Sequence, residues 1–268
     1  MTMSVSRWQK YYSGQYQPVA PILMAATAIF SINRLRRQSL INRQKDYLGI
    51  ASRPDLFRLH QKMNGLLAEG DLNWNSYDYG EGYFYQSYRK IGVTGFRDTE
   101  KRVDAMGLMQ RVTEKDVFEI GSNAGFLSCQ IAAAARSVDA CEIAPHLVRI
   151  AQEAAAFERI SNCRFQSSSF EDFPEQKRYD VVLSFANHST YDGNTRQPLD
   201  EYLAKCRRML VAGGIFLFES HPPQHEGRSH QEVVDCLAEQ FRVEAAEVLT
   251  YGTFLDRDRL FVVARGRN

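Results

Sequence analysis

The sequence predicts an α/β fold in which a helical extension precedes a doubly wound, mostly parallel sheet. From residue 115 onward, short apolar runs alternate with helical patterns. These apolar runs are continuous rather than alternating, which is typical of strands buried on both faces. Residues 1–75 show helical spacing instead, in the stretches 40–50 and 56–67, with Gly65 and Gly70 predicted to end the second helix.

The C-terminal part contains seven expected strands and no internal repeat. Helical runs follow the first, second, fourth and fifth of them, which predicts parallel neighbours. The last two strands have no helical run between them, which predicts an antiparallel hairpin. The expected strands cover residues 117–120, 138–143, 163–168, 180–186, 215–220, 241–250 and 259–265.

The charge of the 268-residue chain divides near residue 104. Residues 1–104 carry 15 Lys/Arg against 9 Asp/Glu, whereas residues 105–268 carry 18 against 23, and the chain as a whole has a net charge of +1. A near-neutral total excludes both a basic chain that coats nucleic acid and an acidic disordered chain. We therefore expect an N-terminal extension over 1–104, acting as a lid or contacting substrate or a second copy, and a separate domain over 105–268.

Cysteine usage and one apolar stretch bear on location. The five cysteines are odd in number and none has C-x-x-C spacing, which indicates core residues in a reducing compartment and hence a cytoplasmic protein. Residues 18–32 form an uncharged stretch of 15 residues, shorter than the ~20 that a membrane span needs. We expect a packed helix or an oligomer contact, with membrane association and an export signal as alternatives. A homodimer through the N-terminal helices, without a stable membrane span, fits this interpretation.

A tyrosine-rich segment precedes the sheet. Residues 76–98 mix six Tyr and Phe side chains between Tyr77 and Tyr88 with four glycines. This composition is typical of a shaped binding loop. It suits equally well a hydrophobic strap that packs over the following domain.

The first expected strand runs into a glycine-rich turn at residues 119–125, EIGSNAG. Gly121 and Gly125 allow a tight turn and close approach of a ligand at the start of a helix. Asn123 stands where a third glycine is common, and asparagine tolerates positive φ. Glu142 ends the second strand, where a carboxylate can accept both hydroxyls of a ribose. The G-x-G-x-x-G spacing of nucleotide-binding dehydrogenases is absent.

With these residues the chain resembles the class I S-adenosylmethionine-dependent methyltransferases over roughly residues 115–265. The resemblance rests on the turn, the acidic end of the second strand, the stretch SSFEDFP at 168–174 and the C-terminal antiparallel pair. It implies a Rossmann-like sheet, S-adenosylmethionine as cofactor and S-adenosylhomocysteine as product. The cofactor-binding residues that it implies are Glu119, Gly121, Ser122, Asn123, Gly125, Glu142, Ile143, Ser169, Phe170, Phe185 and Ala186.

Two cofactor contacts that the resemblance implies are not fixed by the sequence. One departs from the residue usual in the family, and the other has more than one candidate residue. Ser169 stands where many members of the family have Asp, so the contact with the adenine amino group is absent or passes to Glu171. Side chains ahead of the first strand often hold the methionine carboxylate in this family, and Tyr85, Tyr88 and Arg97 are candidates. An arginine fork suits a carboxylate, but Arg97 can also form a salt bridge with Glu100.

The acceptor is expected beyond the fourth and fifth strands, because ligands of such sheets bind at the carboxyl ends of the strands. His188 and Tyr191 follow the fourth strand and His221 follows the fifth, and we take these three as catalytic candidates. A histidine can remove a proton from the acceptor, or it can pin a loop by a hydrogen bond. Glu219, His221 and His225 could hold a divalent metal. No metal-dependent signature is present, and we expect no metal.

Two functions are the main candidates from the sequence, with a protein or lipid acceptor and a non-enzymatic S-adenosylmethionine-binding module as further alternatives. The first is a methyltransferase for an oxygen or nitrogen of a small molecule, in a pocket closed by the tyrosine-rich segment. The second is an RNA methyltransferase, most plausibly for tRNA, that uses the basic N-terminal segment to hold phosphates. The first is favoured because the only dense basic run is RLRR at 34–37.

Overall fold

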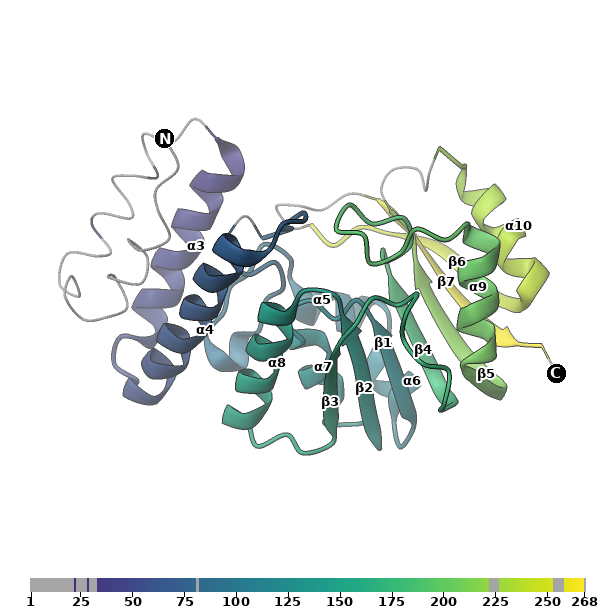
Figure 1. The fold of residues 1–268 in the computed structure, drawn as a ribbon, viewed down its shortest axis with the longest axis horizontal. Helices are drawn as coiled ribbons and strands as arrows, with labels where there is room; N and C mark the ends of the chain where they lie inside the picture. The colour runs from purple at the N-terminus through teal and green to yellow at the C-terminus, as the bar shows by residue number, and fades with distance from the viewer. Residues whose placement is uncertain are drawn as a thin grey trace.

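The computed structural model describes residues 22, 28, 33–80, 82–221, 227–252 and 258–267 (Figure 1). Most of the apolar stretch 18–32, as well as His225, lies outside the described residues. No described helix has the length and apolar character needed to cross a membrane. The helices are α3 (Arg34–Ile50), α4 (Pro54–Asn73), η1 (Arg89–Ile91), α5 (Thr99–Ala105), α6 (Leu108–Val112), α7 (Phe126–Ile131), α8 (Pro145–Phe157), α9 (Leu199–Arg208) and α10 (His230–Gln240).

The described strands form one seven-stranded sheet in the order β3-β2-β1-β4-β5-β7-β6. β7 runs antiparallel to both of its neighbours, whereas the other pairs are parallel. The predicted mostly parallel sheet with an antiparallel C-terminal hairpin is therefore confirmed. The strands are β1 (Asp116–Ile120), β2 (Ser137–Glu142), β3 (Cys163–Ser167), β4 (Tyr179–Phe185), β5 (Leu210–Glu219), β6 (Phe241–Leu249) and β7 (Arg259–Gly266).

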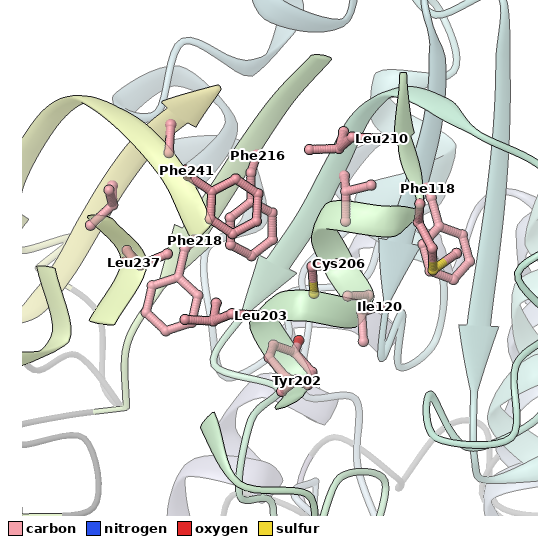
Figure 2. Close-up of a cluster of buried hydrophobic side chains, with 14 of the residues drawn as sticks. Phe118, Ile120, Tyr202, Leu203, Cys206, Leu210, Phe216, Phe218, Leu237 and Phe241 are labelled. Carbon is pink, nitrogen blue, oxygen red and sulfur yellow. The ribbon is translucent and has the colours of Figure 1, made fainter. Parts of the chain in front are cut away.

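Alternate residues of the strands fill two separate cores, because successive side chains of a strand point to opposite faces. On one face, Phe118, Phe216 and Phe218 pack with α9 and α10 (Figure 2). On the other face, Val117 and Leu217 pack with α5, α6 and α7. This alternation directs Glu119 and Glu219 toward the face that α5 covers.

The N-terminal helices share a core with the rest of the chain. α4 lies beside α8 (Figure 1), and its residues join Phe126 of α7 and Ile150 of α8 in one cluster. Gly70 is where α4 meets α8, since a Cβ there would lie 2.4 Å from the ring of His146. The prediction that Gly65 and Gly70 end this helix is wrong, because the packing outweighs the low helix propensity of glycine.

The fifth strand also differs from its prediction. β5 begins at Leu210 instead of residue 215 and passes through Gly213, which has φ +68°. The pairing with β4 changes register between Tyr179 and Val181. The glycine pair therefore forms an irregularity inside the strand rather than a loop before it.

Candidate functional site

A cavity of about 510 Å³ lies at the carboxyl ends of β1, β2, β4 and β5. Its volume falls within the ~300–1,000 Å³ of small-molecule sites. One wall comes from the turn after β1 and the end of β2. The other walls come from the tyrosine-rich segment, the residues after β4 and β5, and the start of β7.

The turn between β1 and α7 presents its backbone to the cavity. Gly121, Asn123 and Gly125 all have positive φ, of +63°, +53° and +69°. A Cβ on Gly121 would lie 2.3 Å from Oδ1 of Asn187, and a Cβ on Gly125 would lie 2.4 Å from that of Ala151. Only glycine fits at both positions, as the sequence pattern predicts.

Glu142 connects this turn to the end of β2. Its carboxylate accepts hydrogen bonds from the backbone nitrogens of Asn123, at 2.8 Å, and Ala144, at 2.9 Å. Burial raises the pKa of Glu142 to about 7, and Asp192 adds to this effect, whereas the backbone hydrogen bonds oppose it. A carboxylate has further lone pairs to offer a ligand. The turn thus orients the Glu142 carboxylate at the cavity wall, where it can accept hydrogen bonds from hydroxyl groups of a ligand.

Glu119 is a second buried carboxyl group of this wall. It accepts a hydrogen bond from the hydroxyl of Ser128. Burial raises the pKa of Glu119 to about 8, even though Ser128 and Arg102 act in the opposite direction. The side chain is therefore mainly protonated at neutral pH when the cavity holds no cation.

The raised pKa of Glu119 makes stability fall as pH rises. In the unfolded chain Glu119 releases its proton above its ordinary pKa of 4.5, whereas in the folded protein it keeps this proton up to about pH 8. The folded protein therefore loses stability from about pH 4.5 to pH 8. At about 1.4 kcal/mol per unit, we expect this residue to remove about 2 kcal/mol between pH 6 and pH 8. Urea unfolding of wild type and Glu119→Gln at both pH values measures the difference. Equal pH dependence of the two proteins would contradict the expectation.

Across the cavity, the carboxylate of Glu219 is fully buried between arginines. Arg102 of α5 donates to it at 2.8 Å, Arg259 lies at 3.5 Å, and the hydroxyl of Tyr251 donates at 2.9 Å. Burial acts to raise the pKa of Glu219, but Arg102, Arg259 and Arg97 hold it down at about 2. Glu219 is thus ionised at every physiological pH.

The same arginines act on Tyr85. Burial acts to raise the pKa of this phenol, but Arg97, Arg259 and Arg102 outweigh it and lower the pKa below its usual value. The guanidinium of Arg97 lies 5.7 Å from the centre of the Tyr85 ring. Glu100, the alternative partner of Arg97 in the sequence, instead accepts from Ser87 and from the backbone of Arg89. This half of the cavity is electropositive.

Most of the residues predicted for the site line the cavity, and six do not. Those that line it are Tyr85, Arg97, Glu119, Gly121, Asn123, Glu142, Phe185, Ala186, Tyr191 and His221. Ser122 and Gly125 lie in the turn behind the surface, and Phe170 is in the core beside α9. The hydroxyl of Ser169 donates to Asp172. Ile143, which the resemblance also implies as a cofactor-binding residue, is absent from the lining as well.

His188 lies outside the cavity lining. Its side chain is fully buried, its Nε2 lies 2.9 Å from the carbonyl oxygen of Gln197, and its ring packs 5.1 Å from that of Tyr202. His221, by contrast, lines the cavity. Burial, aided by Arg259, lowers the pKa of His221. Of the two histidines, the geometry therefore favours His221 for contact with a ligand.

The sequence interpretation missed several lining residues. Arg102 and Arg259 carry charge into the cavity, Gln86 lies beside the turn, and Asn194 holds the backbone of Phe170 at 3.0 Å. Arg102 follows the helix cap Asp98, whose side chain accepts from Lys101 at 3.0 Å and begins α5. That cap could have indicated a short helix there, but not which of its faces is buried.

Fold and site together define a class of protein. A Rossmann-like sheet with an antiparallel β7, a glycine turn after β1 and a carboxylate at the end of β2 are the features of a S-adenosylmethionine-dependent methyltransferase. Residues 117–214 match the family model described as a methyltransferase domain. Over that part of its length this chain carries a methyltransferase domain.

Two known proteins illustrate the similarity. A putative protein N5-glutamine methyltransferase of Methanocaldococcus jannaschii is 28% identical over 121 residues, which are 39% of this chain and 60% of that relative. The chain thus spans less than two thirds of this relative. The crystal structure of the N-methyltransferase NodS from Bradyrhizobium japonicum WM9 with S-adenosyl-L-homocysteine is 15% identical, with a TM-score of 0.51 over 65% of this chain and 91% of NodS. The latter likeness concerns the fold.

Proposed function

We propose that this protein binds S-adenosylmethionine in the cavity and methylates an oxygen or nitrogen of a small-molecule acceptor. The observation that carries the proposal is the composition of this one cavity. The glycine turn and Glu142 form one end, while arginines, tyrosines and His221 form the other. The two ends suit a nucleoside cofactor and an acceptor side by side.

The glycine turn, Glu142 and two residues of the other end, Arg97 and Tyr85, fit the cofactor in detail. Glu142 would accept from the ribose hydroxyls, and the backbone of Gly121 and Asn123 would approach the methionine part closely. Arg97 has a buried Nε and Nη2 without a hydrogen-bond partner in the described part of the chain. Its fork suits the methionine carboxylate, with Tyr85 beside it. When bound, S-adenosylmethionine supplies an electrophilic methyl group.

His221 is our candidate for the general base that removes a proton from the methyl acceptor. Its lowered pKa leaves the ring neutral at pH 7, which is the form that a base needs. We assign His188 a positioning role in the loop after β4. Tyr191 is 78% exposed, at the rim of the cavity, and its ring lies 5.5 Å from that of Tyr77.

The tyrosine-rich segment would close the cavity over the acceptor. Ser76 donates to the backbone of Asp192 at 2.8 Å, and the hydroxyl of Tyr79 accepts from the backbone of Tyr191 at 3.1 Å. These contacts join the segment to the loop after β4. We therefore propose that residues 76–98 form one wall of the acceptor site.

An RNA acceptor is the second candidate. Leu35 lines the cavity from the start of α3, and Arg36 and Arg37 follow it in sequence. These residues could bring phosphates to the mouth of the site. RNA binding that weakens steeply with salt would favour this alternative, whereas an acceptor screen that releases S-adenosylhomocysteine without RNA would favour the first.

Substitution of two glycines tests cofactor binding with a matched control. Gly121 and Gly213 have similar φ, +63° and +68°, but a Cβ at Gly213 meets nothing within 4 Å. Both alanine variants therefore carry similar backbone strain, and only Gly121→Ala crowds the turn. We expect calorimetric titration with S-adenosylhomocysteine to show at least tenfold weaker binding for Gly121→Ala and unchanged binding for Gly213→Ala.

Three outcomes count against the proposal. If wild-type protein freed of bound nucleoside does not bind S-adenosylhomocysteine, the cofactor assignment fails. If both alanine variants bind as wild type does, the cofactor lies elsewhere. If both lose binding to the same extent, strain alone explains the loss.

A further inference from the structure

The half of the cavity opposite the glycine turn holds more positive than negative charge. Arg97, Arg102 and Arg259 all line it, and they are only 2%, 5% and 6% exposed. In the part of the chain that the structure describes, Arg102 and Arg259 pair with the same carboxylate, Glu219, and no ion pair is found for Arg97. One carboxylate therefore pairs with two of the three buried guanidinium groups, and the third has no paired carboxylate among the described residues.

Several donors of these guanidinium groups have no acceptor. Nε and Nη2 of Arg97, Nε of Arg102 and Nε of Arg259 are buried without a hydrogen-bond partner among the described residues. Buried donors are almost always satisfied in proteins, and an unpaired buried charge is costly. Donors of this kind around a cavity are placed to bind an anionic group of a ligand.

The cofactor does not account for this excess. Its methionine carboxylate could neutralise one arginine, but its ammonium and sulfonium groups bring two further positive charges. The backbone of Arg259 lies on β7, three strands from β1, where the glycine turn begins. At ~4.8 Å per strand the separation is about 14 Å.

Building on the proposed function, we propose that the acceptor carries a carboxylate or phosphate group, which Arg259 binds together with the neighbouring Arg102. Arginine forks recognise both oxyanions through paired hydrogen bonds. Glu219 holds Arg102 and Arg259 in place from behind. Since His221 lines the same cavity, the bound anion would fix the acceptor beside the group that takes its proton.

Inorganic phosphate and acetate serve as probes for the anion site. Each is titrated into the full-length protein, free and saturated with S-adenosylhomocysteine, at ionic strength held constant with sodium chloride. We expect saturable binding of at least one probe in both states, weakened at least tenfold in Arg259→Gln. The control Arg242→Gln, at a side chain 70% exposed, should bind like wild type. Preference for phosphate or for acetate distinguishes the two anions.

The same titrations can overturn the proposal. It fails if neither probe binds above the salt control, or if Arg259→Gln binds as wild type does. It also fails if phosphate displaces S-adenosylhomocysteine, because the arginines then serve the methionine carboxylate. If Arg259→Gln does not fold, Arg259→Lys tests the proposal instead. Lysine keeps the charge but lacks the paired donors of arginine, so this variant should bind the probe severalfold more weakly than wild type. Absence of S-adenosylhomocysteine binding would instead refute the proposed function, and the free-state titration would still decide on the anion.

Discussion

Replacing Glu142 with alanine is expected to weaken S-adenosylhomocysteine binding at least 100-fold. The carboxylate would accept two ribose hydroxyls, and hydrogen bonds to a charged group contribute about 1.5–3 kcal/mol each. Its bonds to the backbone of Asn123 and Ala144 also hold the glycine turn in shape. A loss of about 2.7 kcal/mol of binding free energy corresponds to a 100-fold larger dissociation constant. Isothermal titration calorimetry at pH 7.5 measures it directly.

Two further variants separate the causes of this loss. Glu142→Gln keeps the shape of the side chain but removes its charge, so intermediate binding would assign part of the effect to the charge. Glu175→Ala removes an exposed carboxylate paired with Arg208 and should bind like wild type. If Glu142→Ala stays folded and binds within threefold of wild type, the ribose does not lie at this residue.

Replacing Glu219 with glutamine is expected to destabilise the protein by about 3–5 kcal/mol at pH 7. The substitution leaves Arg102 and Arg259 buried without an anion, and removing one partner of a buried ion pair has this order of cost. Urea unfolding followed by circular dichroism gives the free energy. Glu244→Gln, at an exposed pair with Arg242, should lose less than about 1 kcal/mol.

The pH dependence gives an independent check of Glu219. Its folded pKa of about 2 lies below the ordinary 4.5, so its contribution is complete above about pH 4.5 and disappears as pH falls toward 2. The difference corresponds to about 3 kcal/mol. We expect wild type to lose this stability across the window and Glu219→Gln to lose none of it. Parallel curves for the two proteins would contradict a buried, ionised Glu219.

The glycine turn and Glu142, which form the proposed cofactor end of the site, could be located from the sequence because they are local in it. The turn at Gly121 and Gly125 follows one strand directly, and Glu142 ends the next strand. The two strands are parallel neighbours in register, with Glu119 opposite Ala140. Hydrophobic runs and glycine spacing are therefore enough to locate them.

The proposed acceptor end was harder to predict because it depends on contacts between residues far apart in the sequence. Arg102 and Glu219 meet across 117 positions of sequence, and no local pattern indicates their pairing. From the sequence alone, both His188 and His221 are catalytic candidates, because each follows the end of a strand. The chain after β4 passes through positive φ at Ala186 and Ser189, of +58° and +55°, and the His188 ring packs against Tyr202. Such a backbone path cannot be read from residue types.

The shared core of α4, α7 and α8 has a consequence for how this protein can diversify. The segment that carries Tyr77, Tyr79, Tyr85 and Arg97 to the cavity is anchored by Tyr83, Phe84 and Tyr88 in that core. Tyr77 and Tyr79, to which no cofactor contact is assigned, can therefore vary between descendants while Tyr85, Arg97, the anchors and the glycine turn stay constant. New acceptors would then be acquired by point changes on a fixed strap, with no cost to the nucleoside site.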